Sequence, residues 1–164
     1  LSDDVKFENN GRTTILSFYM DWLMAIHFFS EDTKFELSQK LKRKNWLKKI
    51  AETEGFKIQE LNYIFCSDEY LYQINVEYLD HDDYTDIITF DNSEEEKAIE
   101  GDIFISIDRV KENAEKHQQS EERELSRVIS HGLYHLTGYK DKSDSEAKQM
   151  RAKEEFAIEL FEKL

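Results

Sequence analysis

Proline is absent from this chain of 164 residues, and glycine occurs only five times. Turns must therefore be formed mainly by Asn, Asp, Ser and the few glycines. The single cysteine, Cys66, excludes an intramolecular disulfide and a cysteine-rich zinc module, and it is typical of a reducing compartment. We expect Cys66 to be a small, buried apolar residue.

Long hydrophobic runs are also absent. The best candidate for a membrane span, residues 15–29, is short and contains Asp21 and His27. The first dozen residues mix acidic and basic side chains, so they do not predict a signal peptide. These absences indicate a cytoplasmic protein without a membrane partner.

Residues 24–164 are predicted to form a single domain, because no linker, repeat or shift in composition interrupts them. The chain begins with Leu, and Met24 opens a run, MAIHFF, that is typical of a first strand. Residues 1–23 are therefore interpreted as an N-terminal extension or a misassigned start.

Acidic residues outnumber basic ones by 36 to 22, which gives a formal net charge of −14. Such a chain is not a general nucleic-acid coat, because non-specific binding depends on Lys and Arg that neutralise phosphates. One basic segment, residues 40–49 (KLKRKNWLKK), holds six Lys and Arg on a predicted helix. Two interpretations stay open: a solvated helix face anchored by Leu41 and Leu47, or a patch that contacts an RNA backbone.

The pattern of apolar and polar residues predicts an α+β domain with a small, mostly four-stranded sheet covered by about five helices. A capping-box spacing from Thr33 to Glu36 predicts the start of the first helix, which ends before Gly55. A second capping box, from Ser143 to Glu146, predicts the start of the last helix. The predicted strands are residues 25–29, 56–66, 84–90 and 102–107; the predicted helices are residues 33–54, 68–79 (capped by Asp68), 108–117, 120–137 and 143–164; and residues 93–100 are a predicted loop.

His131 and His135 are four positions apart, so on a helix they lie on one face, one turn apart. A pair of imidazole metal ligands needs this arrangement. Gly138 allows the chain to end the helix and turn back, which brings Asp141 towards the same point. Two imidazoles and one carboxylate make a three-ligand site that leaves a position for water, whose pKa the metal lowers towards about 7. The spacing alone also fits two polar histidines beside a packed helix with an ordinary glycine cap.

Gly132 directly follows the first histidine, where zinc peptidases of the H-E-x-x-H kind carry the glutamate that acts as general base. This position argues against a peptidase of that kind. A metal hydrolase of another substrate, such as a small ester, stays open.

Three blocks of sequence point to a known family. Residues 131–141 read HGLYHLTGYKD, residues 74–78 and 84–90 read INVEY and YTDIITF, and residues 101–106 read GDIFIS. They resemble the H-G-x-x-H-L-x-G-Y-D-H signature, the L-N-x-x-Y … T-D-V-L-S-F segment and the G-D-I-x-I-S strand of the YbeY family. The members of this family are the zinc-dependent endoribonucleases of bacterial ribosomal RNA maturation. The resemblance covers about the last 140 residues of the chain.

This resemblance implies a zinc-dependent, single-strand-specific endoribonuclease that acts in ribosomal RNA processing and ribosome quality control. The implied step is late maturation of the 3′ end of the small-subunit 16S RNA. One zinc per chain would be held by His131, His135 and Asp141, on a C-terminal helix and the following turn. The implied partners are ribosomal RNA, the small ribosomal subunit and ribosome-associated proteins.

Two departures from the family pattern concern the site. Asp141 stands where the family has the histidine that is its third zinc ligand, so we expect a His₂Asp site. Leu79 stands where the family has an arginine considered important for nuclease activity, and a leucine cannot stabilise transition-state charge. Lys140 and Lys142 are the candidates to contact phosphate in its place. Leu79 favours an alternative, a non-enzymatic ribosome-assembly module in which zinc is structural.

No protein side chain is assigned as the general base, and the catalytic group is interpreted as a water on the zinc. Asp86 and Asp102 lie in or at the start of predicted strands, and we expect them to form caps or hydrogen bonds within the fold. His27, His81 and His117 have no partner at a metal-binding spacing, so they are not predicted as ligands.

Overall fold

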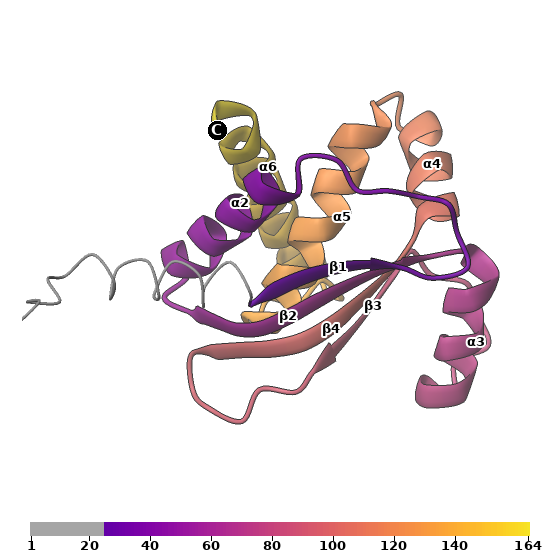
Figure 1. Ribbon diagram of the computed structural model, residues 1–164, viewed down its shortest axis with the longest axis horizontal. Coiled ribbons are helices and arrows are strands. Elements are labelled where there is room, and N and C mark those ends of the chain that lie inside the picture. Colours follow the sequence, from indigo (N-terminus) through magenta and orange to yellow (C-terminus); the bar gives the residue numbers. More distant parts are fainter. Residues whose placement is uncertain (1–24) are drawn as a thin grey trace, which may run out of the picture.

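A mixed four-stranded sheet forms the centre of the structure, a computed structural model that describes residues 25–164 (Figure 1). The strands β1 (Ile26–Ser30), β2 (Lys57–Cys66), β3 (Ile87–Asp91) and β4 (Ala98–Ser106) lie in the order β1-β2-β4-β3. β1, β2 and β4 are parallel, and the edge strand β3 runs antiparallel to β4. The predicted N-terminal extension, residues 1–23, lies outside the described residues.

Within residues 25–164, five helices surround this sheet. They are α2 (Lys40–Thr53), α3 (Asp68–Leu79), α4 (Ile107–Lys116), α5 (Glu121–Leu136) and α6 (Asp144–Lys163). Helices α2, α5 and α6 cover one face of the sheet, and α3 lies on the other side (Figure 1). The prediction of an α+β fold with a small sheet and about five helices is therefore confirmed. None of these helices is long and apolar enough to cross a membrane.

The main core lies between the sheet and the three covering helices. Alternate residues of β2, Leu61, Tyr63 and Phe65, are fully buried in it, since side chains of a strand point to its two faces in turn. The hydroxyl of Tyr63 donates a hydrogen bond to the carbonyl of Ile129 over 2.9 Å. This contact fixes the central helix α5 on the sheet.

A smaller cluster packs α3 against the opposite face. Cys66 joins Leu71 and Ile74 of α3 and Ile88 of β3 there. The cysteine is fully buried, as predicted. Burial, together with nearby carboxylates, raises the pKa of its thiol to about 12, so Cys66 is not a reactive thiolate.

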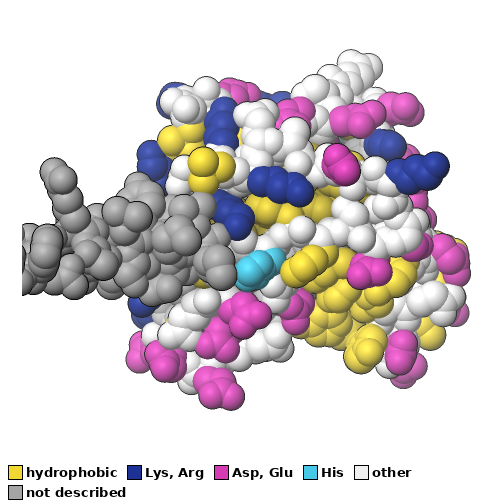
Figure 2. Space-filling view, viewed as in Figure 1, with side chains coloured by type: hydrophobic (Ala, Val, Ile, Leu, Met, Phe, Trp, Pro, Cys, Tyr) yellow, Lys and Arg dark blue, Asp and Glu magenta, His cyan; other side chains and the backbone are white. Residues whose placement is uncertain are grey.

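Next to this cluster, the outer face of the sheet is partly open, and hydrophobic side chains gather on it (Figure 2). A groove of about 490 Å³ between α3 and the sheet is lined by aromatic rings and by the carboxylates of Glu77 and Asp102. Asp102 accepts hydrogen bonds from the side chains of Asn62 (2.9 Å) and Asn92 (3.1 Å). Its role is structural, as expected.

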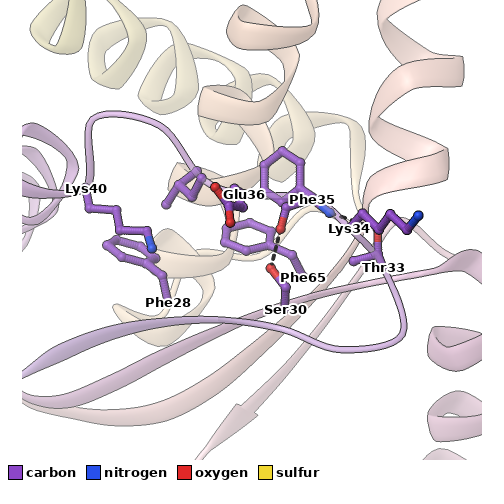
Figure 3. Close-up of a pocket in the computed structure, with 9 residues that line it drawn as sticks. Phe28, Ser30, Thr33, Lys34, Phe35, Glu36, Lys40 and Phe65 are labelled. Carbon is purple, nitrogen blue, oxygen red and sulfur yellow. Dashed lines mark hydrogen bonds between the residues drawn. The ribbon is translucent and has the colours of Figure 1, made fainter.

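The capping box predicted in residues 33–36 is wrong, because α2 begins only at Lys40 and has no side-chain cap. The hydroxyl of Thr33 instead accepts a hydrogen bond from the amide of Phe35 over 3.3 Å. The Phe35 ring packs edge-on against Phe65, with 5.0 Å between centroids. Burial of this ring outweighs the local preference for a helix start, and the segment lines a pocket of about 290 Å³ instead (Figure 3).

Smaller corrections concern the ends of other elements. The cap of α3 is Ser67 rather than Asp68, and its hydroxyl accepts a hydrogen bond from the amide of Tyr70 over 3.1 Å. β4 begins at Ala98, so the loop predicted at residues 93–100 ends earlier. β3 begins three residues later than predicted, at residue 87 rather than 84.

The basic segment at the start of α2 is anchored by Trp46 and Leu47, which are fully buried. Leu41, predicted as an anchor, is 58% exposed, so that part of the prediction is wrong. Arg43 is fully buried and forms an ion pair with Glu122 at the start of α5. This arginine stabilises the packing of two helices and is not available to an RNA backbone.

Candidate metal centre

Helix α5 carries both predicted histidine ligands, and each of its ends is well defined. Ser120 caps the start, where its hydroxyl accepts a hydrogen bond from the amide of Arg123 over 3.2 Å. At the other end, Gly138 adopts a left-handed backbone (φ 98) that most residues avoid. The amide of Tyr139 donates to the carbonyl of Tyr134 over 3.0 Å. The chain therefore turns back along the helix directly after it ends.

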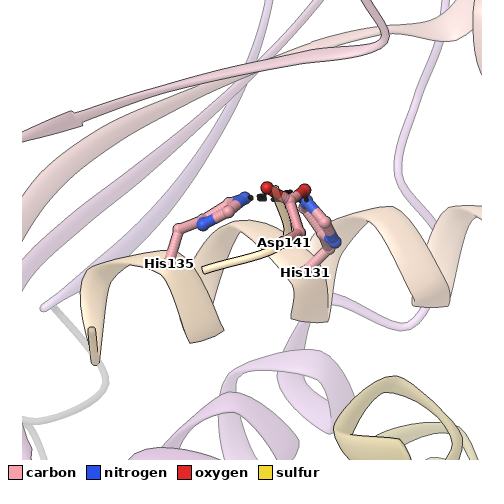
Figure 4. A group of neighbouring side chains, drawn as sticks. All are labelled: His131, His135 and Asp141. Carbon is pink, nitrogen blue, oxygen red and sulfur yellow. Dashed lines mark hydrogen bonds and ion pairs between the residues drawn. The ribbon is translucent and has the colours of Figure 1, made fainter. Parts of the chain in front are cut away.

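This turn brings the three predicted ligands together (Figure 4). The Nε2 atoms of His131 and His135 are 2.8 Å apart. Oδ2 of Asp141 lies 3.4 Å from Nε2 of His131 and 3.6 Å from Nε2 of His135. The imidazoles are largely buried, whereas the carboxylate is 40% exposed, so the cluster opens to solvent on the side of Asp141.

Within residues 25–164, this is the one group of three or more His, Cys, Asp or Glu side chains whose ligand atoms converge. All of these atoms lie within 4.8 Å of one another. His27, His81 and His117 are not part of the group, in agreement with the sequence analysis.

The hydrogen bonds of the two rings determine which nitrogens face the centre. Nδ1 of His135 lies 2.9 Å from the carbonyl oxygen of Tyr139, which only accepts, so this nitrogen carries the proton. Nδ1 of His131 lies 2.6 Å from Oε1 of Glu154, and an ionised carboxylate also only accepts. With Nδ1 donating outward, each ring directs its Nε2 atom towards Asp141.

Three potential ligand atoms, two imidazole nitrogens and one carboxylate oxygen, converge at this point. At the 2.8 Å separation of the two Nε2 atoms, the lone pairs repel each other unless a cation lies between them. Two imidazole nitrogens and one carboxylate oxygen are a usual donor set for a divalent transition metal. The residues present therefore fit a metal ion.

Glu154, on α6, is the residue of the site that the sequence analysis missed. Its side chain is only 7% exposed, and it lies on the buried side of the helix together with Met150 and Ala157. A charged residue at a core position of an amphipathic helix is the signal that would have identified it. Its partner, His131, is distant in the sequence, so no local motif links the two.

Arg127 compensates part of the negative charge behind the histidines. Its guanidinium contacts Glu124 (2.7 Å), Glu154 (3.4 Å) and Asp86 (3.5 Å). Burial opposes the positive charge of Arg127, but the hydrogen bond to Glu124 and the attraction of the three carboxylates outweigh it and raise its pKa. Asp86 thus has the structural role expected for it.

Gly132, between the two histidines, faces the sheet and not the metal centre. A Cβ at this position would lie 2.9 Å from methyl groups of both Ile87 and Ile103. The close approach of α5 to β3 and β4 therefore requires glycine. A glutamate there could not act as a base for a metal-activated water, in agreement with the argument against an H-E-x-x-H peptidase.

The predicted phosphate contacts lie at the edge of the site. Lys140 and Lys142 are both exposed and flank Asp141 in the chain. Lys140 also lines a groove of about 410 Å³, together with Lys97 and Tyr139. Leu79, which replaces the family arginine, is the last residue of α3 and is 40% exposed.

Comparison with known proteins identifies the family of this chain. A family model described as Endoribonuclease YbeY matches residues 25–162. The chain belongs to the YbeY family. It is 59% identical over 136 residues to the Endoribonuclease YbeY of Cytophaga hutchinsonii, covering 83% of this chain and 95% of that protein. It is 48% identical over 133 residues to the Endoribonuclease YbeY of Flavobacterium johnsoniae, covering 81% and 95%.

The fold has a counterpart among solved structures. The solution structure of TM1509 from Thermotoga maritima superposes with a TM-score of 0.60 and 29% sequence identity, over 83% of this chain and 88% of that one. The resemblance inferred from the three sequence blocks is therefore confirmed. Asp141, the last residue of the block that resembles the family signature, converges with His131 and His135.

Proposed function

We propose that this chain is a metal-dependent endoribonuclease that uses one zinc ion, held by His131, His135 and Asp141, to hydrolyse single-stranded ribosomal RNA. The convergence of these three ligand atoms carries the proposal. Membership in the Endoribonuclease YbeY family supports the cleavage of RNA. The proposed role is late maturation of the 3′ end of small-subunit 16S RNA, together with ribosome quality control.

The number of ligands favours an enzyme over a structural zinc site. Structural zinc sites usually have four protein ligands, whereas catalytic sites have three and a position for water or substrate. In the described part of the chain, three ligand atoms converge, and Glu154 contacts the outer nitrogen of His131 instead. Zinc at such a site supplies Lewis acidity and activates water for attack on a phosphodiester.

Other residues of the chain orient the proposed metal ligands. Glu154 and the carbonyl of Tyr139 hold the two imidazoles with Nε2 towards the centre. The exposed carboxylate of Asp141 places the open side of the site at the surface, where an RNA strand reaches it. Lys140 and Lys142 supply positive charge on this side of an otherwise acidic protein.

The nuclease proposal is tested with labelled RNA fragments from the 3′ end of small-subunit precursor RNA. The full chain is expected to cleave the single-stranded form and to leave the duplex form intact. A chelator is expected to abolish cleavage, and added zinc to restore it. Folded, zinc-loaded protein that leaves every single-stranded fragment intact would contradict the proposal.

Replacing both Lys140 and Lys142 with alanine is expected to weaken RNA binding and to make it less sensitive to salt. Each lost phosphate contact reduces the slope of log affinity against log salt by about 0.7 for a single strand. The measurement is RNA affinity at several salt concentrations. Replacing Lys111 and Lys116, two exposed residues of α4, changes the charge equally and serves as the control. Equal slopes for both double variants would exclude the proposed contacts.

Leu79 favours a second candidate, a ribosome-assembly module that binds zinc and does not cleave RNA. Without the family arginine, transition-state charge depends on the metal and on nearby lysines. This candidate predicts that zinc-loaded protein binds small subunits and leaves their RNA intact. Gain of cleavage in Leu79→Arg, with no cleavage by the original chain, would support it.

The proposed substrate also determines partners and location. We propose that the protein acts in the cytoplasm on the small ribosomal subunit, together with ribosome-associated proteins. Co-sedimentation of the chain with immature small subunits, and not with mature ones, is the expected result. Absence from both fractions would contradict the proposed partner.

A further inference from the structure

Glu154 occupies a position where a carboxylate is costly unless it is paired. It lies on the buried side of α6, and its side chain is 7% exposed. Burying an ionised carboxylate requires charged or hydrogen-bonding partners. Its Oε1 atom has two of them: Nδ1 of His131 at 2.6 Å and Nη1 of Arg127 at 3.4 Å. The site therefore contains a buried carboxylate that contacts one of the two histidines.

The hydrogen bond to His131 acts on the outer nitrogen of the ring. A proton held on Nδ1 leaves the lone pair on Nε2, the nitrogen that faces His135 and Asp141. It also fixes the rotation of the ring about its side-chain bonds. A carboxylate in this position makes the imidazole a stronger electron donor to a metal.

The two histidines are held in different ways. Nδ1 of His135 donates to a neutral backbone carbonyl, that of Tyr139, which belongs to the same turn. Nδ1 of His131 donates to an ionised side chain from another helix. The orientation of His135 thus depends on local backbone structure, whereas that of His131 depends on the packing of α6 against α5.

Arg127 is the second partner of the Glu154 carboxylate. Its guanidinium contacts Glu154 and is itself fixed by Glu124, whose side chain is fully buried, at 2.7 Å. Asp86, just before β3, contacts the same guanidinium at 3.5 Å. Movement of Glu154 away from His131 would therefore also disturb its contact with Arg127.

We propose that Glu154 is a positioning residue that holds His131 in the Nδ1-protonated form and thereby makes metal affinity depend on the docking of α6. The inference rests on the metal site of the proposed function, but it does not depend on cleavage of RNA. A protein that binds metal and acts on another substrate would show the same effect.

The first test measures the protonated nitrogen of His131 by nitrogen-15 NMR of the metal-free protein. The original chain is expected to show one Nδ1-protonated form. Glu154→Ala is expected to show a mixture of the two neutral forms, with His135 unchanged. A purely structural role of Glu154 would leave the protonation pattern of His131 unaltered in every folded variant.

The second test measures zinc affinity by competition with a chelator. Loss of a carboxylate partner of a metal-bound histidine costs about 10–100-fold in affinity. Glu154→Ala is expected to fall in this range, and Glu154→Gln, which keeps an acceptor oxygen but loses the charge, to lose less. Glu155→Gln is the matched control, because Glu155 lies next in α6, is exposed and pairs with Arg123.

Two outcomes separate the inference from simple loss of folding. Glu154→Gln retains the size of the side chain, so it carries the test if Glu154→Ala does not fold. If both Glu154→Gln and Glu155→Gln bind zinc as the original chain does, and His131 keeps its proton on Nδ1 throughout, Glu154 is not a positioning residue. If the original chain itself binds no zinc, the proposed function fails, whereas the NMR result still decides the role of Glu154.

Discussion

Replacing His135 with alanine is expected to remove the metal and to lower RNA cleavage by more than about 100-fold. Loss of an outer partner of a ligand already costs about 10–100-fold, and loss of the ligand itself exceeds this. His131 and His135 contribute the two imidazole nitrogens of the site. Without His135, only His131 and Asp141 would remain as ligands. Elemental analysis and single-turnover cleavage measure the two effects.

The matched control is His117→Ala, at the exposed C-terminal end of α4 and outside the metal group. It is expected to retain one zinc per chain and full cleavage. If His135→Ala keeps its zinc, the proposed ligand set is wrong. If it loses zinc and still cleaves RNA at the original rate, zinc takes no part in cleavage and the proposed mechanism is wrong.

Replacing Gly132 with glutamate is expected to destabilise the fold, although it creates the H-E-x-x-H pattern of zinc peptidases. The new side chain would have to enter the interface between α5 and the sheet, where a Cβ already meets Ile87 and Ile103 at 2.9 Å. An unpaired carboxylate buried there lowers the free energy of unfolding by at least about 3 kcal/mol. No peptidase activity is expected.

Urea unfolding of three variants separates the effect of overpacking from the effect of the added charge. Gly132→Ala adds only a methyl group and is expected to cost about 1–3 kcal/mol through overpacking. Ala152→Glu introduces the same charge at an exposed position of α6 and is expected to change little. If Gly132→Glu unfolds at the same urea concentration as the original chain, α5 does not approach the sheet as closely as described.

The sequence predicts the convergence of His131, His135 and Asp141 because it follows from local rules. The helical period brings His131 and His135 to one face, and Gly138 reverses the chain so that Asp141 returns to them. Glu154 follows no such rule, because its contact with His131 depends on how two helices pack. Local spacing predicts a cluster formed by one helix and its turn, and it does not predict a partner from another helix.

Tertiary packing also explains the wrong predictions elsewhere. Thr33 has the spacing of a helix cap, but Phe35 packs against Phe65 and the segment after Thr33 is not helical. Arg43 belongs to a segment whose composition is typical of a basic surface, yet it is buried against Glu122. In both cases a contact with a distant part of the chain outweighs the preference of the local sequence.

The dependence of His131 on α6 has a consequence for the order of events during protein synthesis. Translation proceeds from the N-terminus, so α5 and Asp141 leave the ribosome before Glu154 does. A nascent chain that lacks α6 has both histidines but not the carboxylate that orients one of them. In the proposed nuclease, the carboxylate that orients His131 is thus the last part of the site to be synthesised.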